Sequence, residues 1–170
     1  MDDFSKAILK ELLPVEKELP MPPKGKKKRR DDALDHLSSP VLLERAAYLR
    51  KLAKHGDGSA GEVLKEYPQH AIHLLVRSRN GGAELHENFA DLFFVLEGRA
   101  ALVTGGAVAE ARTIGPGEIR GSSVEGGVRQ ELRAGDVAHV PAGLPHQMLV
   151  SGDKFVTCIV LKIQQEAQKP

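Results

Sequence analysis

The sequence has few aromatic residues and almost no thiols. Its 170 residues include two tyrosines, five phenylalanines, no tryptophan and a single cysteine, Cys158. One cysteine cannot form an internal disulfide, and its place in the apolar run Phe155–Ile163 favours a packed thiol over a nucleophile. We therefore expect the fold to depend on its apolar core, and a reducing, cytoplasmic location is the prediction.

Long hydrophobic runs and a strong net charge are also missing. No apolar run approaches the roughly 18 residues needed to cross a bilayer. Asp2 and Asp3, ahead of short apolar runs, do not fit a secretory signal. A net charge of +1 gives no overall attraction to nucleic acid or to an acidic membrane. No membrane partner is expected. Any electrostatic attraction to such a partner has to come from a local cluster of charged residues.

The first part of the chain is predicted to be a helical extension, residues 1–60. Apolar residues between Phe4 and Leu13 recur at helical spacing. A second helix is indicated by Ser39 as N-cap, Pro40 at its first position and Gly56 as its terminator. Its apolar stripe needs cover, either from the same chain or from a second copy, and a homodimer is the expectation.

Between these helices lies a dense basic run, Lys24–Arg30. It can be a solvated linker, a nucleic-acid contact or a nuclear import signal. The linker leads, because no aromatic residue interleaves the run for base stacking and Asp31 and Asp32 partly offset its charge. A nucleic-acid partner is therefore not expected.

Residues 61–170 are predicted to form the main domain, an all-β barrel. Short apolar runs and two-residue alternation replace the helical period, and glycine-rich turns separate them. An antiparallel barrel or jelly roll is favoured, because closure removes exposed strand edges. The expected strands are 62–66, 71–78, 83–86, 92–97, 100–104, 128–132, 137–140, 147–150 and 154–163.

Two segments carry the polar groups of most interest. In the first, Gly82–Gly98, strand alternation is expected to place His86 and Asn88 on one face, and Asp91 on the inner face of the next strand. In the second, Gly135–His146, a strand is followed by a bend that delivers His146 onto the strand after it. Both histidines are thus predicted to meet at one mouth of the barrel.

These segments resemble the two signature motifs of the cupin superfamily, over roughly residues 62–163. The second motif matches in Gly135, Asp136, Pro141, Gly143 and His146. The first matches in His86 and in its Val95–Gly98 ending. The family's second histidine is Asn88 here, its glutamate is Asp91, and the asparagine that often closes the second motif is Val150. The resemblance implies a double-stranded β-helix, mainly β, with the N-terminal helices as an extension.

The resemblance also implies a metal site of His86, Asp91 and His146, with Asn88 as a weak oxygen ligand. Two imidazoles and a carboxylate can hold iron, manganese, zinc or nickel with open positions for substrate or water. Aspartate is one methylene shorter than glutamate, so its reach to the metal is the critical distance.

The expected ligand is a small organic molecule inside the barrel. The predicted pocket residues are Phe93, Val95, His139 and Met148, and the catalytic residues are unknown. The reaction stays open between a dioxygenase, an isomerase and a cyclase-like lyase, since the fold alone does not supply the chemistry. The alternative is a non-catalytic barrel that binds a small ligand without metal, its histidines hydrogen-bonded to Asp91 and Asn88.

Overall fold

The computed structural model describes residues 36–165, which contain one helix and a set of antiparallel strands. The helix is α2 (Ser39–His55). The strands follow it in the order β1 (Ser59–Tyr67), β2 (His70–Arg77), β3 (Ala83–His86), β4 (Phe89–Thr104), β5 (Ala107–Val108), β6 (Arg112–Gly115), β7 (Glu118–Gly121), β8 (Val124–Glu125), β9 (Val128–Arg133), β10 (Val137–Val140), β11 (His146–Leu149) and β12 (Val156–Gln164).

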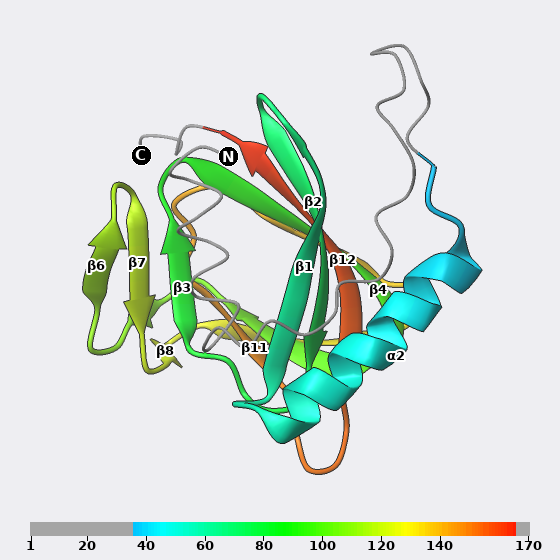
Figure 1. Cartoon of the computed structure of the whole chain (residues 1–170). Coiled ribbons are helices and arrows are strands. Elements are labelled where there is room, and N and C mark those ends of the chain that lie inside the picture. The colour runs from blue at the N-terminus through cyan, green and yellow to red at the C-terminus, as the bar shows by residue number, and fades with distance from the viewer. Residues whose placement is uncertain (1–35, 166–170) are drawn as a thin grey trace.

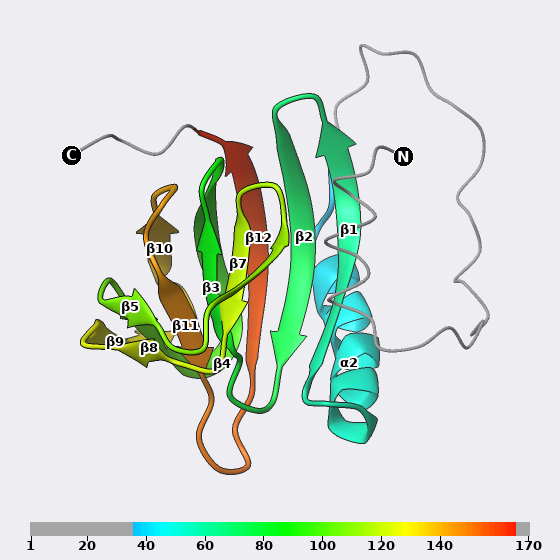
Figure 2. The same cartoon turned by 90° about the vertical axis from the view of Figure 1, so that its left-hand side faces the viewer.

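Ten of the strands form one curled sheet whose order is β1-β2-β12-β4-β11-β3-β7-β6, with β9 and β10 also paired to β4. The other two, β5 and β8, form a separate two-stranded sheet. Every pairing is antiparallel. Figure 1 shows how β1, β2 and β12 lie across the interior from β3 and β7, and Figure 2 gives the view at a right angle. The predicted antiparallel barrel with a helix before it is confirmed.

Strand β4 joins the two halves of this sheet. Its first part lies between β12 and β10, and its second part lies between β11 and β9. The change of partners comes at Gly98, whose φ is 76°. A Cβ there would lie 2.0 Å from the carbonyl oxygen of Phe155, so only glycine fits this crossing. The two strands predicted at 92–97 and 100–104 are therefore one bent strand.

Helix α2 packs on the outside of β1 and β2 (Figure 1). Ser38 is its N-cap, one residue before the predicted cap, and Gly56 ends it as predicted. Its buried face consists of Ala46, Leu49 and Ala53, which share a small core with Ala60, Leu74 and Val76 of the strands. The chain itself thus covers this part of the apolar stripe, whereas Val41, Leu43 and Tyr48 of the helix are exposed. This is the one helix within the described residues, and it is not long and apolar enough to span a membrane.

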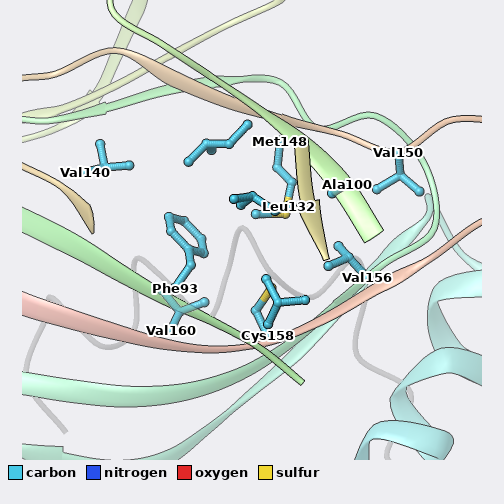
Figure 3. Close-up of a cluster of buried hydrophobic side chains, with 11 residues drawn as sticks. Phe93, Ala100, Leu132, Val140, Met148, Val150, Val156, Cys158 and Val160 are labelled. Carbon is cyan, nitrogen blue, oxygen red and sulfur yellow. The ribbon is translucent and has the colours of Figure 1, made fainter. Parts of the chain in front are cut away.

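The main apolar core fills one side of the barrel interior. Figure 3 shows side chains from β4, β9, β10, β11 and β12 pointing toward one another in it. Strands 83–86 and 137–140 lie where they were predicted. The segment 105–127, for which no strand was predicted, contains β5 to β8. The predicted N-terminal helix and the basic run Lys24–Arg30 lie outside the described residues.

Candidate metal centre and cavity

The two histidines of the sequence motifs meet inside the barrel. His86 ends β3, and His146 begins β11 opposite Glu84 of the same β3 strand. The bend before His146 is tied to the first motif, because the Gly143 N–H donates to the carbonyl oxygen of His86 at 2.7 Å. The two imidazole centroids are 5.3 Å apart, and both side chains are buried. The predicted meeting of the pair is thus what the structure shows.

Asp91 and Lys162 complete the centre of this histidine cluster. They are paired neighbours on β4 and β12. The Lys162 Nζ atom lies 2.8 Å from Asp91 Oδ1 and 2.8 Å from His86 Nε2. The second oxygen, Asp91 Oδ2, is 3.4 Å from the Nε2 atom of each histidine. All four side chains are at least nine-tenths buried, so their charges are balanced by one another rather than by water.

Hydrogen bonds fix which ring nitrogen of each histidine faces the centre. His86 Nδ1 is 2.6 Å from Glu118 Oε2, and His146 Nδ1 is 3.2 Å from the carbonyl oxygen of Leu144. Carboxylate and carbonyl oxygens accept hydrogen bonds, so both Nδ1 atoms carry hydrogen. In the neutral rings, both Nε2 lone pairs then point inward beside Asp91. A carboxylate or carbonyl behind the imidazole is also the usual outer support of a metal-ligating histidine.

Glu84, Glu118 and Arg120 surround this centre on strands β3 and β7. Glu84 Oε2 lies 3.4 Å from His86 Nε2. The Arg120 guanidinium pairs with Glu118 at 3.2 Å and with Glu84 at 3.6 Å. Three carboxylates, counting Asp91, thus face two basic side chains, Arg120 and Lys162. This excess of negative charge favours one further positive charge at the histidines.

The pKa values follow from this charge balance. Burial alone would lower the pKa of His86, but hydrogen bonds to Asp91, Glu118 and Glu84 outweigh it and raise the pKa to about 10. Burial would raise the pKa of Asp91, but Lys162 and the two histidines hold it well below its usual range. An ammonium and an imidazolium cannot both donate across the 2.8 Å contact between Lys162 and His86. In this contact one of the two nitrogens therefore donates and the other accepts.

The donor set also fits a divalent metal. Among the residues that the structure describes, Glu84, His86 and His146 each offer a ligand atom, and these atoms all lie within 4.8 Å of one another. Two ligand atoms at about 2.1 Å from a tetrahedral metal are about 3.4 Å apart. His86 Nε2 has that separation from both Glu84 Oε2 and Asp91 Oδ2, and His146 Nε2 has it from Asp91 Oδ2.

A cavity of about 360 Å³ opens beside the cluster. Its polar lining includes Glu84, Asp91, Arg120, His146 and Lys162, and its apolar lining includes Leu75, Phe93, Met148 and Val160. This volume lies within the usual range for small-molecule sites. The cluster therefore forms one wall of a space large enough for a small organic ligand.

Some of the predicted site residues lie at the histidine cluster and its cavity, and the others do not. His86, Asp91 and His146 come together, and Phe93 and Met148 line the cavity. Val95 lies in the packed core and not in the cavity lining. Asn88 and His139 are exposed, so neither faces the cluster. For Asn88 the reason is that β3 ends at His86 and the chain bends at residues 87–88, so strand alternation does not continue.

Four residues of the site were not among the predicted ligands. Lys162 could have been identified from the sequence, because it is the one charged residue in the apolar run Val156–Ile163. Alternation places it on the same face as Val160 and Cys158, which indicates that it points inward. Glu84 precedes His86 by two residues, which places both on one face of β3. Glu118 and Arg120 lie in the segment for which no strand was predicted, so nothing in the local pattern pointed them inward.

No protein-family model matches the sequence, and no curated protein matches it. Three solved structures illustrate what the chain is similar to. The DMSP lyase DddQ from Ruegeria pomeroyi DSS-3 is 18% identical over 66% of this chain and 50% of that one, with a TM-score of 0.47. The cupin domain of Cnp3 from Schizosaccharomyces pombe is 13% identical over 63% and 65%, with a TM-score of 0.48.

The third is an uncharacterised protein with a double-stranded β-helix domain from Klebsiella pneumoniae, 17% identical over 65% of this chain and 80% of that one, with a TM-score of 0.47. The chain thus spans half the length of the first of these proteins and about two-thirds of the second. At such identities a likeness concerns the fold alone. In this chain, β3–β4 and β10–β11 carry the two histidine motifs within one curled antiparallel sheet, which is the fold that the motifs predicted.

Proposed function

We propose that this protein binds a divalent transition metal at the histidine cluster and acts there on a small organic molecule held in the cavity. The observation that carries the proposal is the pair of inward Nε2 atoms, with Asp91 and Glu84 beside them at tetrahedral ligand separation. Imidazoles whose outer nitrogens are already bonded to Glu118 and Leu144 are preorganised ligands.

The residues that would hold the metal are His86, His146, Asp91 and Glu84. A bound divalent ion supplies Lewis acidity or activates water or dioxygen. Around it, Glu118 holds the His86 ring in place, and Arg120 orients Glu84 and Glu118. Glu84 is half-buried and lines the cavity, and its pKa is held well below its usual range, since His86 and Arg120 outweigh the effect of burial. Its carboxylate is therefore ionised and available as a metal ligand at the cavity wall.

Lys162 sets a condition on metal binding. The Nε2 atom of His86 has one lone pair, and the Lys162 ammonium lies within hydrogen-bond distance of it. A metal ion and this ammonium therefore compete for the same electrons. Binding requires Lys162 to leave His86, and it can keep its contact with Asp91 Oδ1.

The same contact favours one alternative, a metal-free barrel that binds a small ligand. The Lys162 ammonium is itself a cation between His86 and Asp91. It can therefore balance the negative charge of the carboxylates in place of a metal ion. In that case the cluster orders the barrel mouth and the cavity recognises a ligand without chemistry at a metal.

Metal content decides between the two functions. Protein purified without chelator is expected to carry near-stoichiometric iron, manganese, nickel or zinc by elemental analysis, and the His86→Ala and His146→Ala variants are expected to carry none. His139→Ala is the matched control, since this exposed histidine lies outside the cluster. A wild-type protein without metal, which also takes up none of these ions at micromolar concentration, would show that the metal proposal is wrong.

A further inference from the structure

The cavity has a second polar end, on strands β1 and β2, that the metal proposal does not use. Within residues 36–165, the buried side-chain atoms without a hydrogen-bond partner are Ser59 Oγ, both ring nitrogens of His73, and Arg77 Nε. All three residues line the cavity. Buried polar groups are almost always paired in native proteins, so unpaired ones gathered at one cavity indicate a missing partner.

Ser59 and Arg77 stand side by side in this polar end. They are directly paired across β1 and β2, which places their side chains on the same face of the sheet. The guanidinium of Arg77 lies against Gly81, where a Cβ atom would be 2.8 Å from Nη1 and 2.9 Å from Cζ. The absence of a side chain at Gly81 thus leaves the space that the guanidinium occupies.

Arg77 differs from the other cations of the cavity in its charge partners. Lys162 pairs with Asp91, and Arg120 pairs with Glu84 and Glu118. Arg77 has no carboxylate within ion-pair distance in the described part of the chain. Asp57, the other acid of the cavity lining, accepts the backbone N–H of Ser59 at 3.0 Å. One uncompensated guanidinium is suited to a ligand with one negative charge.

The rest of the β2 face indicates the shape of that ligand. Leu75 lies between Arg77 and His73 on the same face of the strand, and His73 is about 13 Å along the strand from Arg77. Burial and the nearby charge of Lys162 lower the pKa of His73 to about 4, so its imidazole is neutral and can donate or accept a hydrogen bond. An apolar stretch thus separates a cationic end from a neutral polar end.

We infer that the cavity takes a small organic monocarboxylate. Its carboxylate binds Arg77 and Ser59, and its apolar body lies against Leu75, Phe93 and Met148. Its far end reaches His73 and the histidine cluster. This inference rests on the proposed function in taking the cavity as the place where the organic molecule binds, and it names that molecule's chemical class.

Calorimetric titration of the full chain with hexanoate and with its neutral isostere hexanamide tests the assignment. Both titrations use protein stripped of metal, so that a metal cannot bind the carboxylate. Hexanoate is expected to bind about tenfold or more tightly than hexanamide, because only the carboxylate satisfies the guanidinium. Equal affinities, or no saturation by hexanoate below about 10 mM, would overturn the inference.

Variants locate the binding. Arg77→Gln is expected to weaken hexanoate binding about tenfold or more, and Gly81→Ala to weaken it by displacing the guanidinium. Arg79→Gln is the matched control, because Arg79 is exposed and bonds to the carbonyl oxygen of Gly56, outside the cavity lining. Unchanged affinity in Arg77→Gln, or equal loss in Arg79→Gln, contradicts the site. Unfolding curves of each variant identify any loss that comes from misfolding.

Metal uptake by the wild-type protein, measured beside the hexanoate titration, keeps this test separate from the metal proposal. A preference for hexanoate over hexanamide, in wild-type protein that takes up no metal, would support the carboxylate site and exclude the metal centre. Metal uptake without any preference for hexanoate over hexanamide would do the reverse.

Discussion

The two sides of the barrel interior are built largely from different strands, and they differ in what fills them. On the packed side, apolar residues such as Ala100, Leu132 and Val156 fill the space between β4, β9 and β12 (Figure 3). On the cavity side, β1, β2, β3 and β7 contribute charged and polar side chains around about 360 Å³ of space. Phe93, Met148 and Val160 belong to both sides. Burial stabilises the first side, whereas electrostatic pairing holds the second.

Removing the cation of the cavity side is expected to have the largest effect. Lys162→Met leaves Asp91 and His86 without their 2.8 Å partner in a buried place. Breaking such a pair from one side should lower the free energy of unfolding by about 3 kcal/mol. The variant's zinc affinity should rise, since the His86 lone pair is then free of competition. Urea unfolding with chelator measures the first effect, and zinc titration the second.

Lys154→Met is the control for that variant, because Lys154 is exposed on the turn before β12 and outside the cavity lining. Zinc at about 100 times its dissociation constant should restore about 2.7 kcal/mol to Lys162→Met. A variant as stable as wild type in chelator, with unchanged zinc affinity, would show that Lys162 neither balances the cluster nor competes for His86.

Acid should weaken the cavity side through His73. The pKa of this imidazole is lowered to about 4 in the folded chain, against about 6.5 when unfolded. The unfolded state therefore binds the proton more readily, and the free energy of unfolding falls as the pH drops from 6.5 toward 4, by up to about 3 kcal/mol. His73→Gln, which carries no titrating group, should flatten this fall. Urea unfolding at several pH values measures it.

The exposed His139 provides the comparison for His73. His139→Gln should leave the pH dependence of unfolding as it is in the wild type. Should His73→Gln lose stability as steeply as the wild type between pH 6.5 and 4.5, the buried imidazole is not the group that protonates on unfolding.

Much of the packed side could be predicted from the sequence. Alternating apolar residues identified the strands, and the spacing of Gly135 and His146 placed the second histidine at the barrel mouth. Such patterns work because strand alternation and turn residues are local properties. Val95, a predicted pocket residue, shows what alternation cannot predict. The pattern indicates that a side chain faces inward, but not whether it lies in the packed core or lines the cavity. The homodimer and the cytoplasmic location stay predictions.

The cavity side was only partly predictable, because its polar partners come together through pairing of distant strands. Lys162 lies 76 residues from His86 in sequence, and Glu118 lies 32 residues from it. Glu118 and Arg120 lie in one short strand, β7, between glycine-rich turns, where the apolar alternation that indicates a strand is weak. The bend after His86 likewise explains why Asn88 lies outside the site. In an unbroken strand, Asn88 would have been on the same face as His86.

Two valines of strand β12 allow a direct comparison of the packed side with the cavity side. Val156 is in the packed core, and Val160 borders the cavity. Val156→Ala should cost about 2.5 kcal/mol, because the lost transfer energy of two methyl groups is joined by a new void. Val160→Ala should cost about 1.5 kcal/mol, since space already adjoins the side chain. Urea unfolding of both variants gives the difference, and equal costs would mean that the cavity is closed in solution.

Enlarging Val160 is expected to have the smallest effect on stability and a clear one on binding. Val160→Ile adds one methylene at the cavity wall, which should raise the free energy of unfolding by about 0.5 kcal/mol, less than full burial of a methylene gives. The same methylene takes space that hexanoate would use, so its affinity should fall. A stabilised variant that binds hexanoate as well as wild type would place the ligand elsewhere. The expected gain in stability would show that the open space costs stability, as expected of a cavity kept for a ligand.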